Sequence, residues 1–240
     1  MLAEVGVHKR FPDGYIYPYN IWDFARPSFF CPHDLERVGT LGDGGKVVCG
    51  MSQYENISPG PSSASNNAPE LIVYSFGVSD DSSFEASLLE RTNAKIWGYD
   101  FSVESWSDDN ANPPMYTVQD VMRMNGHSYV DIIKMDIEGA EFDALTSLIH
   151  FIQSEDSHGN MPFGQLLLEI HFMRDPKGFS IPKTLRSWVD WWESLEQMGL
   201  RPVNNEGNWI GDAQFGRPRF MEYTFINAID YERNKLLPSQ

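Results

Sequence analysis

The chain has 240 residues, of which 41% are hydrophobic and 13% aromatic, which is enough apolar surface for one sizeable core. Its 34 acidic residues outnumber 18 basic ones, giving a formal net charge of -16 that repels a phosphate backbone, so nucleic acid is an unlikely partner. Only two cysteines occur, Cys31 and Cys49, which excludes a disulfide-rich scaffold and a four-cysteine zinc site; the pair is either free or bridged.

The chain carries no recognisable membrane or export segment. It has no apolar run of about 18 residues or more, and its N-terminus lacks the basic-then-apolar order of a signal peptide. We therefore expect a soluble protein. A cytoplasmic location is slightly favoured, and a secretory location would follow if an N-terminal anchor had been removed.

The N-terminal region differs in composition from the rest. Residues 1–51 mix aromatic residues, prolines and glycines without a helical period, which predicts an irregular cap packed on the core. Residues 52–70 are rich in Ser, Asn, Pro and Gly and are expected to form a mobile loop. The regular pattern of the main domain then covers residues 71–230.

From residue 71 onwards, apolar runs alternate with helical patterns. Strands are predicted at residues 71–76, 95–99, 130–135 and 165–170. Helices are predicted at 83–91, where Ser82 and Glu85 fit a capping box, and from Glu141 to about Ile149. Because strands alternate with helices, right-handed crossovers should give a doubly wound, mostly parallel α/β sheet.

The last part of the chain predicts a helix and two further strands. The helix ends at Gly199, and its tryptophans (Trp188, Trp191 and Trp192) have the spacing of core or lid residues. The segments 201–203 and 223–226 are expected to pair as an antiparallel edge of the sheet.

A glycine and an acid follow the first two predicted strands. Ligands of open α/β sheets bind beyond the carboxyl ends of the strands. Gly77 lets the backbone approach a ligand closely, and Asp100 is placed to accept hydrogen bonds from both hydroxyls of a ribose. The pair predicts an adenosine-containing ligand, either S-adenosylmethionine or NAD.

The turn after the first strand favours S-adenosylmethionine. It has one glycine where a dinucleotide fingerprint has three, and it carries Asp80 and Asp81 where a pyrophosphate would lie. Two carboxylates repel a pyrophosphate but tolerate a zwitterionic amino acid with a sulfonium. An NAD-dependent oxidoreductase is thereby disfavoured, although an acid at a helix start also has a purely structural use.

Several of these segments match one family. They are residues 73–79, 83–85, 98–100 and, most specifically, 134–141 with the pattern Lys-x-Asp-x-Glu-Gly-x-Glu. Together they resemble the FkbM-related methyltransferase-like domain, and residues 37–39 and 42–46 with Cys49 resemble its eukaryotic branch. The resemblance covers most of residues 31–227.

The resemblance implies a class I, Rossmann-like methyltransferase fold and methyl transfer to oxygen, often on sugar-like or polyketide hydroxyls. The expected cofactor contacts are Phe76, Gly77, Val78, Asp80, Ser83, Asp100, Phe101 and Asp136. The chain departs from the family between Asp100 and Tyr116, where a further strand is usual and residues 102–114 are short, polar and acidic.

The later strand ends carry candidate catalytic residues. Asp136 and Glu138 should project together, as should Glu169 and His171, because residues two apart on a strand share a face. The cluster could remove a hydroxyl proton, with Asp136, His171 and Glu169 as catalytic residues, or hold a hard divalent cation. No typical ligand spacing favours the cation, whose candidate ligands are the same four side chains.

Other polar residues have substrate or structural interpretations. Glu138 and Lys46 are expected to face the substrate, although Glu138 and Glu141 also suit the first turn of the following helix. Lys134 lies inside a predicted strand and should pair with a neighbouring acid. His33 is assigned to a surface turn.

The sequence therefore predicts an S-adenosylmethionine-dependent methyltransferase that acts on an oxygen of a small-molecule or sugar-like acceptor. Two alternatives remain. One is an N-methyltransferase for a small molecule, peptide or nucleoside, and the other is a catalytically silent module that binds S-adenosylmethionine.

Overall fold

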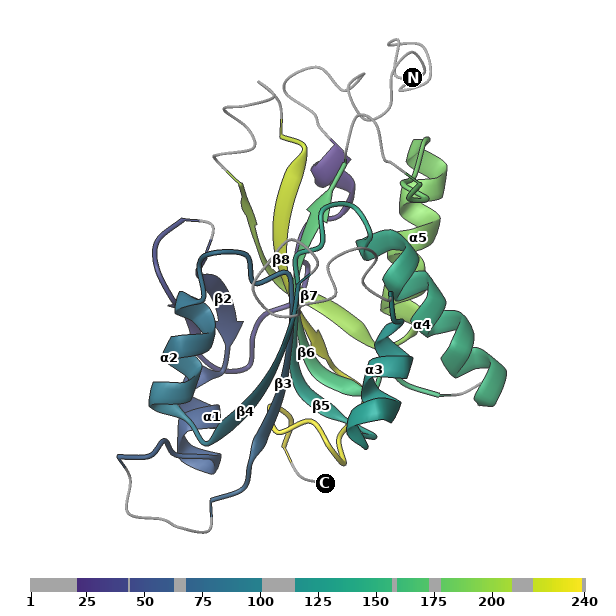
Figure 1. The fold of residues 1–240 in the computed structure, drawn as a ribbon. Helices are drawn as coiled ribbons and strands as arrows, with labels where there is room; N and C mark the ends of the chain where they lie inside the picture. The colour runs from purple at the N-terminus through teal and green to yellow at the C-terminus, as the bar shows by residue number, and fades with distance from the viewer. Residues whose placement is uncertain are drawn as a thin grey trace, which may run out of the picture.

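The computed structural model describes residues 21–42, 44–62, 68–100, 115–156, 159–172, 178–208 and 218–238. A six-stranded sheet lies at its centre (Figure 1). The strands are β3 (Leu71–Phe76), β4 (Ala94–Tyr99), β5 (Val130–Met135), β6 (Phe163–His171), β7 (Leu200–Gly207) and β8 (Phe220–Asn227). Their spatial order is β4-β3-β5-β6-β8-β7. The first four are parallel, and β8 is antiparallel to both neighbours. This confirms the predicted sheet with its antiparallel C-terminal edge.

Helices cover both faces of the sheet (Figure 1). On one face lie α1 (Met51–Ile57), α2 (Ser83–Arg91) and a hairpin of β1 (Leu35–Val38) and β2 (Lys46–Cys49). On the other lie α3 (Val118–Asn125), α4 (Glu141–Glu155) and α5 (Leu185–Gln197), while the short 3-10 helix η2 (Ile21–Phe24) packs beside β6 and α5. Two hydrophobic cores result, one on each face of the sheet.

The central strands form where they do because both of their faces are covered. All residues of β5 and β6 are buried, including Asp131 and Lys134 of β5, and cover on both faces explains why the rest of each strand is largely apolar. Successive residues of β3 point to opposite faces, so Val73 packs in the core beneath α2 and Tyr74 in the core beneath α3. The tryptophans of α5 lie in that second core, with Trp188 fully buried, as predicted.

The capping box predicted for α2 is wrong. Ser82 is the N-cap residue, but its side chain makes no cap hydrogen bond. The Glu85 side chain instead turns into the sheet, where it accepts hydrogen bonds from Ser75 and from Lys134 Nζ, the latter at 3.3 Å. Because a buried lysine needs a counter-charge, Glu85 serves the core rather than the helix end. The prediction that Lys134 pairs with an acid is confirmed.

The N-terminal region is more ordered than its composition predicted. Residues 52–57 lie at the start of the predicted mobile loop but form most of α1, whose Tyr54 is 1% exposed. Its hydroxyl accepts a hydrogen bond of 3.2 Å from Gln165 on β6, which docks the helix on the sheet. Nearby, Cys31 and Cys49 are joined by a disulfide that ties the cap to the end of β2.

Helix α3 was not predicted, although its ends carry clear signals. Thr117 and Asp120 form a capping box, and Gly126 ends the helix with a φ of 71°. The segment between Asp100 and Met115, with Phe101 and the departure from the family pattern, lies outside the described residues. In the parts of the chain that the structure describes, no helix is long and apolar enough to cross a membrane.

Candidate functional site

The chain reverses its direction of winding between β3 and β5. From β3 it passes outward to β4 and then returns to β5 on the other side of β3. Such a switch point opens a crevice beyond the strand ends. Gly77 lies there with a φ of 77°, and a Cβ at this position would be 1.7 Å from the carbonyl oxygen of Asp136. Only glycine fits, so close packing against β5 explains Gly77 independently of any ligand.

The turn after β3 is bound to the end of β4. Ser79 has a φ of 52°, and its backbone N–H donates to Asp100 Oδ2 at 2.6 Å. Asp81 accepts hydrogen bonds from the Ser83 amide and the Thr40 hydroxyl, which hold the pKa of Asp81 below its usual value. The structure thus brings the predicted cofactor residues at the ends of β3 and β4 to one turn, which the β1–β2 hairpin contacts through Thr40.

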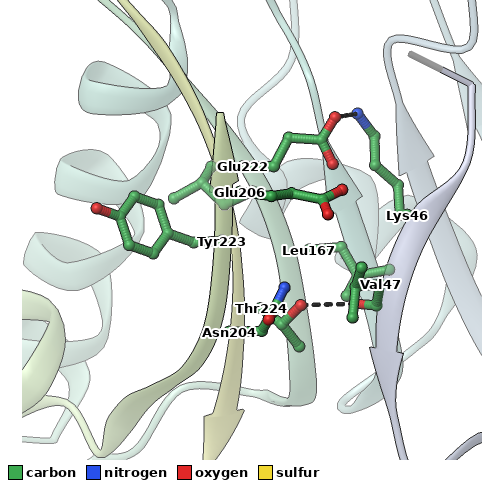
Figure 2. A pocket seen from close by; sticks show the side chains of 9 residues that line it. Lys46, Val47, Leu167, Asn204, Glu206, Glu222, Tyr223 and Thr224 are labelled. Atoms are coloured by element: carbon green, nitrogen blue, oxygen red, sulfur yellow. Dashed lines mark hydrogen bonds and ion pairs between the residues drawn. The ribbon is translucent and has the colours of Figure 1, made fainter. Parts of the chain in front are cut away.

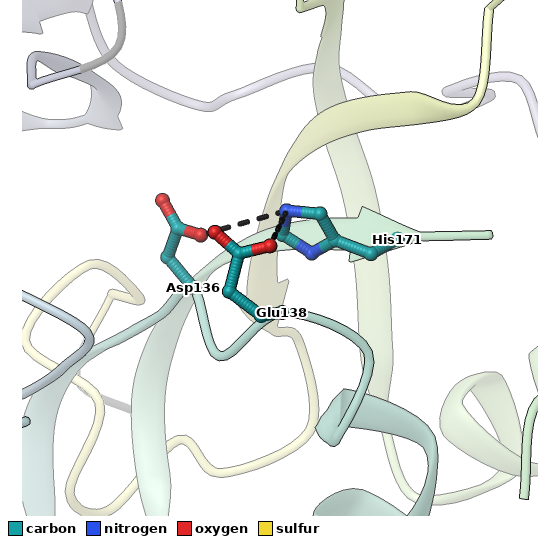
Figure 3. A group of neighbouring side chains, drawn as sticks. All are labelled: Asp136, Glu138 and His171. Carbon is teal, nitrogen blue, oxygen red and sulfur yellow. Dashed lines mark ion pairs between the residues drawn. The ribbon is translucent and has the colours of Figure 1, made fainter. Parts of the chain in front are cut away.

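The predicted cluster at the ends of β5 and β6 is assembled (Figure 3). His171 Nε2 lies 3.7 Å from Asp136 Oδ1, 3.9 Å from Glu138 Oε2 and 3.8 Å from Glu169 Oε1. Glu138 follows β5 in a left-handed conformation with a φ of 56°. In the described residues, Glu138 and Ser79 are the only residues other than glycine with a positive φ. Both lie in turns at the strand ends, where such strain commonly marks functional sites.

Glu141 orients His171. This glutamate is fully buried at the start of α4, and its Oε1 accepts a hydrogen bond of 2.8 Å from His171 Nδ1. The same oxygen accepts from the amides of Ile137 and Gly139, each at 3.1 Å. Burial alone lowers the pKa of His171, but Glu141 and the nearby carboxylates of Glu169 and Asp136 raise it to about 9. The sequence suggested only a first-turn acid at position 141, and this role was missed.

Lys46 joins the hairpin to the cluster. Its Nζ lies 3.2 Å from Asp136 Oδ2, 3.3 Å from Glu169 Oε2 and 2.9 Å from Glu222 Oε1 (Figure 2 shows the last pair). Burial by itself lowers the pKa of Lys46, yet the three carboxylates raise it above its ordinary value. Lys46 is 3% exposed, and its charge neutralises the buried acids around it. The sequence analysis had not singled out Glu222.

The pKa values of the carboxyl groups around Lys46 are shifted in different directions. Burial, together with the charge of Asp136, raises the pKa of Glu169 to about 8. Burial also raises the pKa of Glu222. The pKa of Asp136 is lowered, because Lys46 and His171 outweigh the effect of its burial. Asn208 donates to Glu169 Oε1 at 2.7 Å and completes the surroundings of that carboxylate.

A small cavity adjoins this cluster on the side of the β1–β2 hairpin (Figure 2). Residues of β2, β6, β7 and β8 line it, among them Lys46, Asn204 and Glu222. Thr224 and Val47 also line it, and the Thr224 hydroxyl donates a hydrogen bond of 2.6 Å to the Val47 carbonyl. The cavity lies beside the ion cluster and not in the turn after β3.

The remaining candidate from the cap has a structural role. His33 Nε2 pairs with the Leu236 carbonyl at 2.8 Å. Asp34 beside it accepts a hydrogen bond of 3.3 Å from the Ser52 amide at the start of α1. Neither residue joins the strand-end cluster through a contact that the structure describes.

Comparison with known proteins agrees with this architecture. A search of curated proteins found no match. The family model of the methyltransferase FkbM domain matches residues 4–202, which is most of the chain and includes both the turn after β3 and the cluster at the ends of β5 and β6. The chain therefore belongs to the FkbM methyltransferase domain family.

Proposed function

We propose that the protein uses S-adenosylmethionine as its methyl donor and transfers the methyl group to an oxygen of a small-molecule or sugar-like acceptor. One observation carries the proposal. The turn after β3, Asp100 after β4 and Asp136 after β5 meet at the switch point of a sheet that belongs to a methyltransferase family.

The donor would lie along the ends of β3 and β4. Asp100 is positioned beside the turn by the Ser79 amide, and a ribose hydroxyl would share or replace that contact. The N-terminus of α2 begins behind the turn at Ser83 and favours the carboxylate of a methionine group. The exposed acid Asp80 supports a sulfonium donor over a dinucleotide, because a carboxylate repels a pyrophosphate.

The acceptor would lie toward the ends of β5 and β6. Methyl transfer breaks the bond from sulfur to the methyl carbon, forms a carbon–oxygen bond and releases the hydroxyl proton. The nearest titratable groups are Asp136, Glu169 and His171. Because the pKa of His171 is raised to about 9 and that of Glu169 to about 8, whereas that of Asp136 is lowered, the Asp136 carboxylate is the group that is ionised at neutral pH and can take up this proton. Glu138, whose side chain is 60% exposed, is the member of the cluster that an acceptor reaches first.

Nitrogen is the second candidate acceptor atom. Five carboxylates (Asp136, Glu138, Glu141, Glu169 and Glu222) lie around Lys46 and His171, so acids outnumber bases among these described residues. This excess of negative charge would also attract a cationic amine. An acceptor screen therefore needs both alcohols and amines.

Isothermal titration calorimetry tests the donor. Wild type, Asp100→Ala and Asp190→Ala are titrated with S-adenosylmethionine, S-adenosylhomocysteine and NADH in a chelating buffer; Asp190 is an exposed aspartate on α5. We expect binding of the sulfur ligands with a Kd in the micromolar range, about 8 kcal/mol, for wild type and Asp190→Ala, and at least about tenfold weaker binding for Asp100→Ala. Binding of NADH alone, or no binding by wild type, would refute the proposal.

A further inference from the structure

We propose that Asp136, Glu138 and His171 form a binding site for one divalent cation. One carboxylate oxygen of each acid and Nε2 of the histidine all lie within 4.8 Å of one another. Figure 3 shows the two carboxylates and the imidazole nitrogen pointing into the same space. The residues come from the ends of β5 and β6, which are paired neighbours in the sheet.

The buried imidazole of His171 distinguishes this group from a cluster of acids at the surface. His171 is 3% exposed, and its Nδ1 is already bound to the buried carboxylate of Glu141. No described residue offers Nε2 a hydrogen bond, since the nearest carboxylate oxygen is 3.7 Å away. A histidine held by a carboxylate through one nitrogen, with the other directed at further ligands, is the usual arrangement of a metal-binding histidine.

The separations suit ligands of one ion. Oxygen and nitrogen ligands lie about 2.0–2.2 Å from Mg²⁺ or Zn²⁺, so two ligands on the same ion are roughly 3–3.7 Å apart. Nε2 lies 3.7 Å from Asp136 Oδ1 and 3.9 Å from Glu138 Oε2. Both distances are too long for a hydrogen bond, and both lie within a few tenths of an ångström of the separation between two ligands of one ion. The three ligand atoms lie within 4.8 Å of one another, so the side chains would move together by up to roughly 1 Å to coordinate one ion.

The two oxygens of Asp136 have different neighbours. Lys46 lies at 3.2 Å from Oδ2, and His171 Nε2 lies at 3.7 Å from Oδ1, which is the oxygen assigned to the ion. Carboxylates are ligands of Mg²⁺ and Mn²⁺, and imidazole is a ligand of Zn²⁺ and Fe²⁺, so the mixed set suits a divalent ion without selecting one. Three protein ligands leave further positions of the ion for a substrate oxygen. That such an oxygen belongs to the methyl acceptor, whose hydroxyl the ion would acidify, rests on the proposed function.

Mn²⁺ is the probe for the test, because the electron paramagnetic resonance signal of the free aqua ion measures binding directly. The folded protein is titrated without methyl donor or acceptor, as wild type, Glu138→Gln and Glu90→Gln. Glu138 is largely exposed, so its amide variant should fold normally, and Glu90 is an exposed glutamate near the end of α2. Circular dichroism confirms the fold of each variant.

We expect wild type and Glu90→Gln to bind one Mn²⁺ with equal Kd, and Glu138→Gln to bind it roughly 10- to 100-fold more weakly. His171→Gln should lose binding to the same extent. Absence of stoichiometric binding to wild type, or equal Kd values for Glu138→Gln and Glu90→Gln, would overturn the proposal. The calorimetric titration with S-adenosylmethionine is run in chelator, and the Mn²⁺ titration is run without a methyl donor. Each experiment therefore tests its own proposal, and a negative result in one does not affect the other.

Discussion

Replacing Lys46 by methionine should destabilise the protein strongly. Methionine fills a similar volume, so the substitution removes the charge and leaves packing nearly intact. In the native protein the Lys46 ammonium is within 3.3 Å of three carboxylates, Asp136, Glu169 and Glu222. Without it, acids that are largely buried lose their counter-charge.

The expected loss follows from the burial of this group. Breaking a buried ion pair by removal of one partner costs about 3–5 kcal/mol, because the other partner remains desolvated. With an m-value of about 3 kcal/mol/M in urea, the midpoint should fall by roughly 1–1.7 M. A second substitution, Glu222→Gln, removes one uncompensated charge and should recover part of the loss in the Lys46→Met background.

The assay is urea denaturation followed by circular dichroism in chelating buffer, so that no bound cation replaces the lysine. Lys95→Met is the matched control, because Lys95 pairs with Glu70 at 2.6 Å but 58% of its side chain is exposed. Its midpoint should change by less than about 0.3 M. If Lys46→Met shifts the midpoint no further than Lys95→Met, Lys46 does not balance buried charge and the reasoning is refuted.

Three further substitutions test other parts of the fold by the same denaturation assay. Gly77→Ala should cost roughly 1–3 kcal/mol more than Gly126→Ala, because both glycines have a positive φ but only the Cβ at position 77 meets Asp136; equal costs would contradict the close packing of β3 and β5. Cys31→Ser should lower stability by about 3 kcal/mol, since the bridged cysteines are 18 residues apart, and an unchanged midpoint for wild type in reductant would argue against the bridge. Thr184→Ala should cost about 1 kcal/mol, because the Thr184 side chain accepts a hydrogen bond from the Ser187 amide at the start of α5; no loss would mean that this cap contributes nothing.

The strands of the sheet and the residues at their ends were predictable from local pattern. A strand covered on both faces is mostly apolar, so β3 and β5 were predicted with the bounds that the structure has, although β5 also buries Asp131 and Lys134. Because the carboxyl ends of strands in an open α/β sheet share one edge, Asp136 and His171 were also expected to be neighbours, and they are. The period of two does not place Asp136 and Glu138, since β5 ends at Met135 and Glu138 has a left-handed conformation. Composition was less reliable for α1, because two buried residues, Met51 and Tyr54, dock a segment that is largely polar.

The partners of the buried charges were decided by tertiary structure alone. Glu85 resembled a capping residue and Glu141 a first-turn acid, yet each side chain turns inward to a basic residue, Lys134 and His171 respectively. Lys46 is 176 residues from Glu222 in the chain, so no local pattern connects them. A buried charge takes whatever counter-charge the packed elements bring within reach, and for this protein only the assembled sheet, hairpin and helices determine which one that is.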